Sequence, residues 1–284
     1  MQPFVKWAGD KRQLLSEIKS RIPSVFNNYY EPFIGGGALL LDLAHTPSII
    51  SDNNHTLIEA YETIRDFPDE LKKQLNAIQQ EHNTIGNKDR VKEFYYTKRK
   101  EYNDLIFSKD DLIRKTTLFI CLNKACFNGL YRVNQKGFFN VPSNQKTTIN
   151  LYNEQNIDEI SSFLRNVTIY NQDFGKTAEN TQKGELVFFD SPYAPLNPQS
   201  FDSYTKEGFS IDEHIRLSEL YKTLSKRGVF CILTNHNTEL IRELYKDFTI
   251  EVVDVKRMIN SDSKNRESKE IIVTNYEYGK YQSK

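Results

Sequence analysis

Two kinds of hydrophobic pattern alternate along the chain. Short apolar runs that end at glycine, proline or an acidic residue are typical of buried strands. They occur at residues 29–33, 48–52, 167–170, 186–190 and 229–234. Apolar positions with helical spacing occur at residues 38–44, about 56–65 and 212–226. This order of strands and helices predicts an α/β fold with a doubly wound, mostly parallel sheet.

The middle and the end of the chain follow other patterns. Residues 68–124 have helical spacing, long charged stretches and few strand signals. Residues 130–141 alternate enough to predict a β-hairpin with its turn near residues 135–137. Residues 248–256 and 270–276 predict an antiparallel terminal strand pair joined by a polar loop.

These patterns divide the chain into two parts. Residues 1–56 and 147–284 are predicted to form one α/β domain from both ends of the chain. Residues 57–146 are predicted to form a mostly helical insertion that carries the hairpin. At 284 residues the chain is long enough for one such elaborated domain.

Charge changes this picture only locally. The whole chain is neutral, with 38 basic and 38 acidic residues, but residues 88–146 hold 13 Lys and Arg against 6 Asp and Glu. The same window contains ten aromatic residues, and a basic, aromatic-rich segment fits a face that binds a polyanion. From charge alone, the favoured interpretation is a solvated helical surface over an aromatic core.

The three cysteines, Cys121, Cys126 and Cys231, are odd in number and lie in apolar surroundings. We expect buried free thiols in a reducing compartment, and therefore a cytoplasmic location. No run approaches the roughly 20 apolar residues of a membrane helix, and the first residues lack the apolar run of a signal peptide.

A glycine turn follows the first predicted strand. Glycines there let a backbone approach a ligand closely, and Asp52, 17 residues after Gly35, ends the next strand, where an acid can accept ribose hydroxyls. The glycines of the segment Glu31-Pro32-Phe33-Ile34-Gly35-Gly36-Gly37 lie too close together for the dinucleotide motif. Taken alone, the segment is almost as easily a structural turn.

The run 186–189 ends in Asp190-Ser191-Pro192-Tyr193, called the tetrad below. Ligands of open α/β sheets bind beyond the carboxyl ends of the strands. The Asp190 carboxylate and the Ser191 carbonyl can accept both hydrogens of an exocyclic amine, and Tyr193 can stack on an extruded base. Asp-Ser-Pro is also good turn chemistry, so the tetrad alone fits a turn equally well.

Together and in order, these motifs resemble the DNA adenine-N6 methyltransferases of the Dam type, the alpha group. The similarity runs from about Phe4 to Tyr276 and is carried by residues 4–12, Glu31 to Gly37, 128–134, 139–142, Asp190 to Tyr193 and 233–237. It implies a class I methyltransferase fold, a site-specific adenine methyltransferase activity and S-adenosylmethionine as methyl donor. No metal is needed, because the cofactor supplies the electrophile.

The resemblance also assigns roles to residues. It implies that Trp7 and Lys11 contact the cofactor, that Phe33, Gly35 and Gly37 line its methionine end, and that Asp52 binds its ribose. Asp190 is also expected to contact the cofactor. In the insertion it implies that Arg132 reads a guanine in the major groove. Further contacts with double-stranded DNA are implied for Phe127, as a wedge, and for Asn128, Leu130 and Pro142. The target suggested is GATC, and the loop 256–269 is expected to contact phosphates.

Three positions depart from the family pattern. Ser191 replaces the usual proline of the tetrad, Asp10 replaces a glycine before Lys11, and residues 143–146 read Ser-Asn-Gln-Lys instead of an aromatic, glycine and arginine. The Ser191 acceptor is a backbone carbonyl, so the chemistry is expected to survive. The changes after Pro142 bear on the recognition sequence.

Several alternatives stay open. The same acceptor logic serves methylation of adenine in RNA or of cytosine N4, and a third reading is a DNA-binding protein without turnover. The chain contains no paired C-x-x-C, H-E-x-x-H, G-x-S-x-G or P-loop motif, which disfavours a zinc enzyme, an α/β-hydrolase and a P-loop NTPase. The sequence leaves open whether the chain is a housekeeping methylase or serves beside a cognate restriction endonuclease without binding it.

Overall fold

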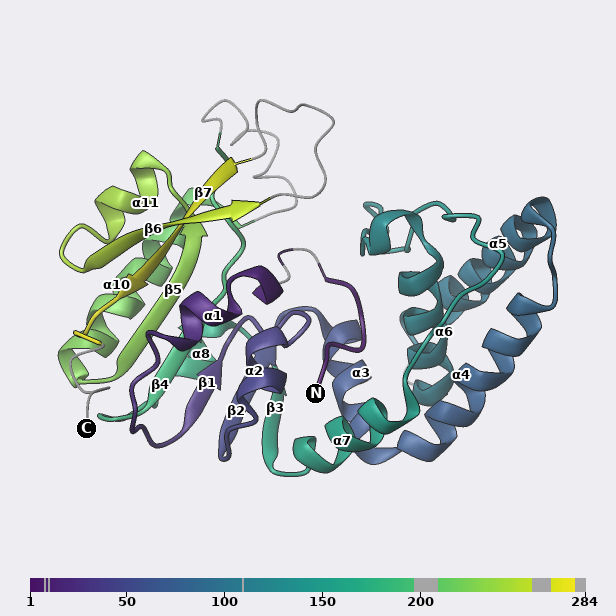
Figure 1. Cartoon of the computed structure of the whole chain (residues 1–284), viewed down its shortest axis with the longest axis horizontal. Coiled ribbons are helices and arrows are strands. Elements are labelled where there is room, and N and C mark those ends of the chain that lie inside the picture. Colours follow the sequence, from purple (N-terminus) through teal and green to yellow (C-terminus); the bar gives the residue numbers. More distant parts are fainter. Residues whose placement is uncertain (8, 10, 109, 197–208, 257–266, 279–284) are drawn as a thin grey trace. The chain divides into compact units, whose positions relative to one another are not determined.

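A computed structural model describes residues 1–7, 9, 11–108, 110–196, 209–256 and 267–278. Within them, seven strands form one sheet in the order β3-β2-β1-β4-β5-β7-β6. The strands are β1 (Tyr29–Glu31), β2 (Ser48–Asp52), β3 (Val167–Asn171), β4 (Leu186–Phe189), β5 (Phe230–His236), β6 (Thr249–Lys256) and β7 (Glu267–Thr274). The sheet is mostly parallel, with β7 antiparallel to β5 and β6. The predicted class I methyltransferase fold is therefore confirmed (Figure 1).

The chain divides into two compact units. The first comprises residues 1–10, 35–44 and 54–171, and the second comprises residues 11–34, 45–53 and 172–284. The predicted domain boundaries at residues 56 and 146 stay a prediction, because compactness does not decide which residues bind DNA.

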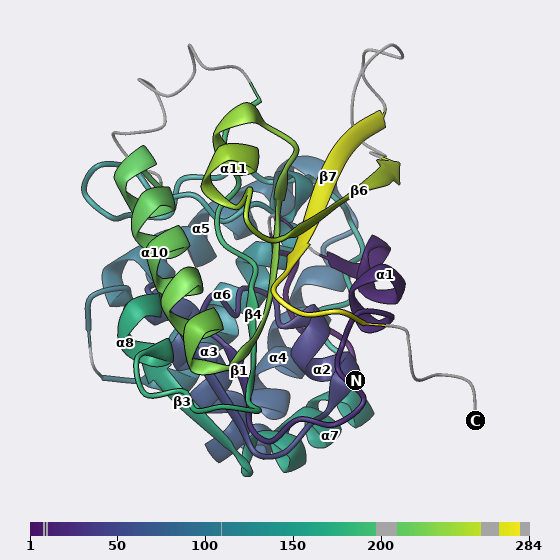
Figure 2. The same cartoon turned by 90° about the vertical axis from the view of Figure 1, so that its left-hand side faces the viewer.

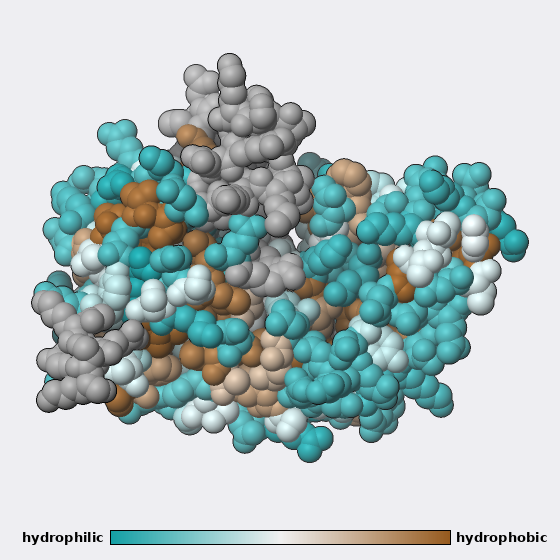
Figure 3. Space-filling view, viewed as in Figure 1, coloured by the Kyte–Doolittle hydropathy of each residue, from teal (hydrophilic) through white to brown (hydrophobic). Residues whose placement is uncertain are grey.

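The first unit is mostly helical. It contains α2 (Ala38–Leu43), α3 (His55–Asp66), α4 (Pro68–Asn83), α5 (Lys88–Leu105), α6 (Leu112–Ala125), the short 3-10 helix η2 (Phe127–Gly129), α7 (Glu154–Leu164) and β3. Ten residues of α6 are buried, because α3, α4 and α5 all pack against it. The sides of α4 and α5 seen in Figure 3 are mostly hydrophilic, so the charged stretches of this region are a solvated surface around a buried central helix.

The second unit holds the centre of the sheet. Besides strands it contains η1 (Lys11–Gln13), α1 (Leu15–Lys19), α8 (Phe174–Ala178), α10 (Ile211–Arg227) and α11 (Glu239–Leu244). All four residues of β4 are buried, and α10 packs along β5 (Figure 2). The apolar run 186–189 is continuous because a central parallel strand is covered on both faces. The core therefore fixes the strand whose end carries the tetrad.

Residues 130–141 reverse direction with a single antiparallel bridge, between Val133 and Phe139, in place of two regular strands. Asparagine side chains form hydrogen bonds with several backbone N–H and carbonyl groups that would pair with each other in a regular hairpin. The Asn134 amide oxygen accepts from two N–H groups of the turn, and Asn103 of α5 pairs with both the N–H and the carbonyl of Phe139. Asparagine competes with the strand ladder in this way whenever its amide reaches the backbone.

The remaining expectations have simple outcomes. Cys121, Cys126 and Cys231 are buried and free, as predicted. In the described residues, no helix has both the length and the apolar character needed to cross a membrane. Most of the loop expected to contact phosphates, and Asp10, lie outside the described residues.

Candidate active site

Asp190 lies directly after β4, at the carboxyl end of the strand. Its Oδ1 atom contacts Lys11 Nζ at 2.6 Å and accepts a hydrogen bond from the Thr234 hydroxyl at 2.9 Å. Burial raises the pKa of Asp190 above its ordinary value, although the Lys11 ammonium and both hydrogen bonds oppose the rise. Asp190 is thus an oriented acceptor in a largely dry environment.

Lys11 joins two members of the tetrad. It is 6% exposed, and its ammonium lies 4.5 Å from the centre of the Tyr193 ring as well as against Asp190. A cation over an aromatic face and beside a carboxylate is stabilised by both. The structure therefore shows Lys11 at the tetrad, and the cofactor contact expected for it stays a prediction.

Tyr193 is braced through its hydroxyl, which donates to Glu270 Oε2 at 2.8 Å. Its ring meets the His236 ring edge-on, with centroids 4.8 Å apart. Burial raises the pKa of Tyr193 well above its ordinary value, so the phenol remains a neutral donor. Glu270 on β7 is buried and stands opposite His236 on β5. Strands β5 and β7 therefore orient the tetrad's aromatic ring.

The backbone after the tetrad is held by Asn235. Its amide oxygen accepts from Ala194 N at 2.9 Å, and its amide nitrogen lies 3.4 Å from Ser191 Oγ. A ring nitrogen of His236 bonds the Ala194 carbonyl at 2.7 Å. Ser191 is buried and Pro192 is exposed. These contacts fix the loop that serine leaves less restricted than proline would.

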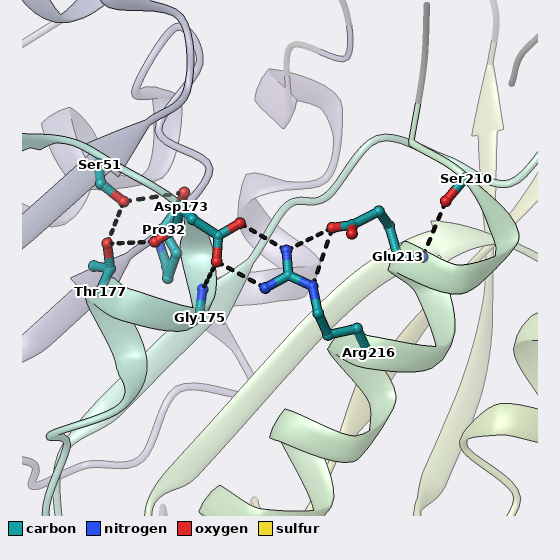
Figure 4. A network of polar contacts seen from close by, with 8 residues as sticks. All are labelled: Pro32, Ser51, Asp173, Gly175, Thr177, Ser210, Glu213 and Arg216. Atoms are coloured by element: carbon teal, nitrogen blue, oxygen red, sulfur yellow. Dashed lines mark hydrogen bonds and ion pairs between the residues drawn. The ribbon is translucent and has the colours of Figure 1, made fainter. Parts of the chain in front are cut away.

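The ends of β1 and β2 are tied together in the second unit, as Figure 4 shows. The Ser51 hydroxyl lies 3.2 Å from the Pro32 carbonyl and 2.6 Å from Thr177 Oγ1 of α8. Pro32 precedes Phe33 in the chain, and Ser51 precedes Asp52. Because β1 and β2 are parallel, their carboxyl ends share one edge of the sheet. Two of the residues predicted to bind the cofactor are thereby placed at that edge.

Phe33 belongs to an aromatic cluster. It stacks on Phe174 at 5.1 Å, and the Arg216 guanidinium lies 3.9 Å from the centre of the Phe174 ring. Arg216 binds both carboxylate oxygens of Asp173, at 2.8 and 2.6 Å (Figure 4). The same hydrogen bonds hold the pKa of Asp173 below its ordinary value. An ion pair thus joins the start of α8 to α10 beside Phe33.

Trp7 and the glycine turn belong to the first unit. Gly35 and Gly37 have φ of +47° and +68°, and a Cβ atom on Gly35 would lie 2.9 Å from Trp7 Cδ1. The Tyr61 hydroxyl donates to the Gly35 carbonyl at 3.0 Å. Only glycine fits this conformation against the indole, so the turn presents bare backbone.

Residues 127–142, called the recognition loop below, keep two large apolar side chains in solvent. Phe127 is 53% exposed and Leu130 is 40% exposed. Phe127 N bonds the Pro142 carbonyl at 2.8 Å, and Arg132 Nε bonds Asn140 Oδ1 at 2.7 Å. The loop thus gathers Phe127, Leu130, Arg132 and Pro142, together with Asn128, whose φ is +56°.

The sequence did not reveal three of the residues that shape the tetrad. Thr234 and Asn235 lie in the segment 233–237, which resembles the family, but no pattern gave either side chain a role. No local pattern indicated a role for Glu270, because the residue that it contacts, Tyr193, lies 77 positions away in the chain. Among the described residues, no three His, Cys, Asp or Glu side chains are grouped as a metal site would require.

Comparison with known proteins places these features in a family. Residues 7–259 match the D12 class N6 adenine-specific DNA methyltransferases. The chain belongs to this family. It is 39% identical to the Type II methyltransferase M1.LlaDCHI of Lactococcus lactis subsp. cremoris, over 97% of this chain and 96% of the relative.

Two further relatives are similar to the chain over nearly their whole length. The chain is 39% identical to the Type II methyltransferase M.MjaIII of Methanocaldococcus jannaschii, over 97% of this chain and 99% of the relative. It is 29% identical to the DNA adenine methylase of Escherichia coli strain K12, over 97% and 95%. The similarity to each of these three relatives therefore covers nearly the whole chain.

Proposed function

We propose that this family member transfers the methyl group of S-adenosylmethionine to N6 of an adenine extruded from double-stranded DNA, within GATC. The observation that carries the proposal is the oriented Asp190 carboxylate beside Tyr193 at the end of β4. Bound cofactor supplies an electrophilic methyl group on a sulfonium sulfur. The protein residues bind the base and orient its amine.

Asp190 and the Ser191 carbonyl accept hydrogen bonds from the two N–H groups of the adenine amine. When N6 bonds to the methyl carbon, the carbon–sulfur bond of the cofactor breaks, S-adenosylhomocysteine leaves, and one N6 proton is lost to solvent. Lys11 and Thr234 both contact Oδ1 of Asp190, so we assign Oδ2 to the amine. Two acceptors draw electron density back onto N6 and direct its lone pair toward the methyl group. Tyr193 stacks on the base, and Glu270 prevents its ring from turning away.

The residues proposed to hold the cofactor suit its chemistry. The bare backbone of the Gly35–Gly37 turn against Trp7 allows close approach of a ligand, since a side chain there would collide with the indole. Asp52 is assigned to the ribose hydroxyls, and Phe33 to the sulfonium end, where an aromatic face attracts a cation. Lys11 is assigned a polar contact on the cofactor side of Asp190.

We assign target recognition to residues 57–146 and catalysis to residues 1–56 and 147–284. Arg132 reads a guanine, Phe127 enters the opened duplex, and Asn128, Leu130 and Pro142 flank the site. The exposure of Phe127 and Leu130 supports this assignment, because both side chains are accessible to DNA.

We further propose that the chain is the modification enzyme of a restriction-modification system. Its identity to the two Type II methyltransferases, 39%, exceeds its 29% identity to the adenine methylase of Escherichia coli. Such an enzyme protects host DNA from a cognate endonuclease by methylating the shared site, without binding the endonuclease.

The decisive experiment measures transfer of tritiated methyl from the cofactor to matched duplexes. The expected result is label in a GATC duplex, protection of that duplex from a GATC-cleaving nuclease blocked by N6-methyladenine, and no label in a GTTC duplex. Label in structured RNA or on cytosine, or no transfer to any duplex, would overturn the proposal. Sequencing of methylated adenines in DNA from expressing cells would then report the full target.

A further inference from the structure

Asn123, near the end of α6, uses its whole amide to join two distant segments of the first unit. Its Oδ1 accepts from Lys6 N at 2.8 Å, and its Nδ2 donates to the Lys6 carbonyl at 2.8 Å and to the Gly129 carbonyl at 3.1 Å. Asn123 is 1% exposed. One side chain thus pairs with the backbone of Lys6 as a neighbouring strand would, and with the start of the recognition loop.

The two joined segments also pack directly on each other. Gly129 has a φ of +67°, and a Cβ atom there would lie 2.7 Å from Lys6 Cβ. A side chain at position 129 would therefore collide with Lys6. The contact links residues 123 positions apart in the chain, so its strength comes from tertiary structure alone.

Trp7, the next residue, extends this contact to the glycine turn. Its ring stacks on Tyr131 of the recognition loop with centroids 5.5 Å apart and planes 24° apart. The edge of the same indole closes against Gly35. Trp7 thus contacts both the glycine turn and Tyr131, the residue before Arg132.

Asn123 belongs to a helix, α6, that is largely buried. Ten residues of the helix are buried, whereas Lys6 and Gly129 lie outside long helices and regular strands. Removal of the Asn123 amide would leave the N–H and carbonyl of Lys6 and the carbonyl of Gly129 without this partner, which disfavours the observed arrangement. The amide thus holds two segments that have little regular structure of their own.

We infer that Asn123 is a positioning residue that couples the cofactor-binding segment at Trp7 to the recognition loop, so that bound cofactor sharpens discrimination between DNA sequences. The inference rests on the proposed function, which assigns Trp7 and Gly35 to the cofactor and the recognition loop to DNA. Coupling between two sites in one protein is commonly a factor of about 5 to 150.

The test measures dissociation constants for a GATC duplex and for a GTTC duplex, by fluorescence anisotropy, with and without S-adenosylhomocysteine. In the unmodified protein, the ratio of the two constants should rise about 10-fold when S-adenosylhomocysteine is added. In Asn123→Ala the rise should fall below about 2-fold, while calorimetric affinity for S-adenosylhomocysteine changes less than about 3-fold.

Asn103→Ala is the matched control. Asn103 pairs with the N–H and carbonyl of Phe139 in the same two-bond manner, near the other end of the recognition loop. This variant should bind both duplexes more weakly and keep the cofactor-dependent rise. If Asn103→Ala loses the rise as fully as Asn123→Ala, the effect is general loosening of the loop and the inference is wrong.

Folding is checked by circular dichroism and thermal unfolding of each variant. Should Asn123→Ala not fold, Asn123→Asp replaces it, because this variant keeps the acceptor for Lys6 N and loses both donors. The inference is wrong if the folded variant keeps the full rise in the ratio of dissociation constants. It is also wrong if the unmodified protein methylates DNA but shows no such rise. Absence of methyl transfer by the unmodified protein overturns the proposed function instead.

Discussion

The tetrad in the second unit and the recognition loop in the first unit are held in different ways. The tetrad follows a buried central strand, β4, and is braced by Thr234 and Asn235 from the adjacent strand β5 and by Glu270 from β7. The recognition loop has a single backbone bridge and is held by side chains of α5 and α6, including Asn103 and Asn123.

This difference matches the two roles proposed for these regions. Methyl transfer needs acceptors and an aromatic ring in fixed positions before the substrate arrives, and strand ends supply that rigidity. Reading DNA needs exposed side chains that can follow a groove, and a loop anchored by side chains leaves them in solvent. The predictions below test whether the two regions differ in function as they do in construction.

The largest effect is expected at Asp190. Asp190→Ala should lower the rate of methyl transfer by about 10³-fold, because an oriented acceptor for the amine is lost. Binding of S-adenosylmethionine should largely persist in calorimetry. The control is Asp254→Ala, which removes an exposed carboxylate of β6 and should leave transfer nearly unchanged. Near-normal turnover of Asp190→Ala would refute its role.

In the recognition loop we expect a smaller effect, on discrimination between DNA sequences and not on the rate of methyl transfer. Arg132→Ala should reduce discrimination against a changed guanine by about 10- to 100-fold, the value of one good base contact. Competition between duplexes that differ at each position of GATC would measure this. Lys136 is an exposed cation of the same loop. Lys136→Ala should instead weaken binding to all duplexes equally and reduce the salt dependence of binding.

The brace on Tyr193 should matter less than Asp190 itself. Glu270→Ala should lower transfer about 10-fold, because a hydrogen bond to a charged acceptor is lost and the ring is no longer oriented. Steady-state kinetics of Glu270→Ala, Tyr193→Phe and the double variant would measure the coupling. Fully additive losses would show that Glu270 acts by another route.

The smallest effect concerns the stability of the second unit. His214 is 1% exposed, and burial lowers its pKa from 6.5 to about 4. A histidine with a depressed pKa contributes stability that is fully present above its unfolded pKa and is lost as pH falls toward the folded one. Urea unfolding should therefore show a loss of about 1 kcal/mol between pH ~7.5 and ~5.5.

His214→Leu should lack this part of the pH dependence, whereas His55→Gln, at an exposed position, should keep it. An identical loss of stability in unmodified protein and His214→Leu would exclude His214 as its source.

Much of the molecule followed from local pattern. The strands that end at Asp52 and before Asp190, the glycine turn and helices α2, α3 and α10 were predicted from runs of apolar residues and their spacing, and the structure has them within a few residues. Residues 68–124 were predicted only to be helical as a whole, and α7 was not predicted. Such elements are readable because burial of a strand or of one helix face imposes its period on neighbouring positions. The order of the motifs likewise determined the family, which comparison confirmed.

Partnerships between distant side chains were decided only by tertiary structure. Lys11 meets Asp190 and Glu270 meets Tyr193 because particular strands and turns become neighbours in the sheet, and no local period records that neighbourhood. The recognition loop keeps one bridge because asparagines of the turn and of α5 take its backbone groups. Asn123 reaches Lys6 across 117 residues. The sequence determined where strands end and which residues stand there, and packing determined which side chains hold them.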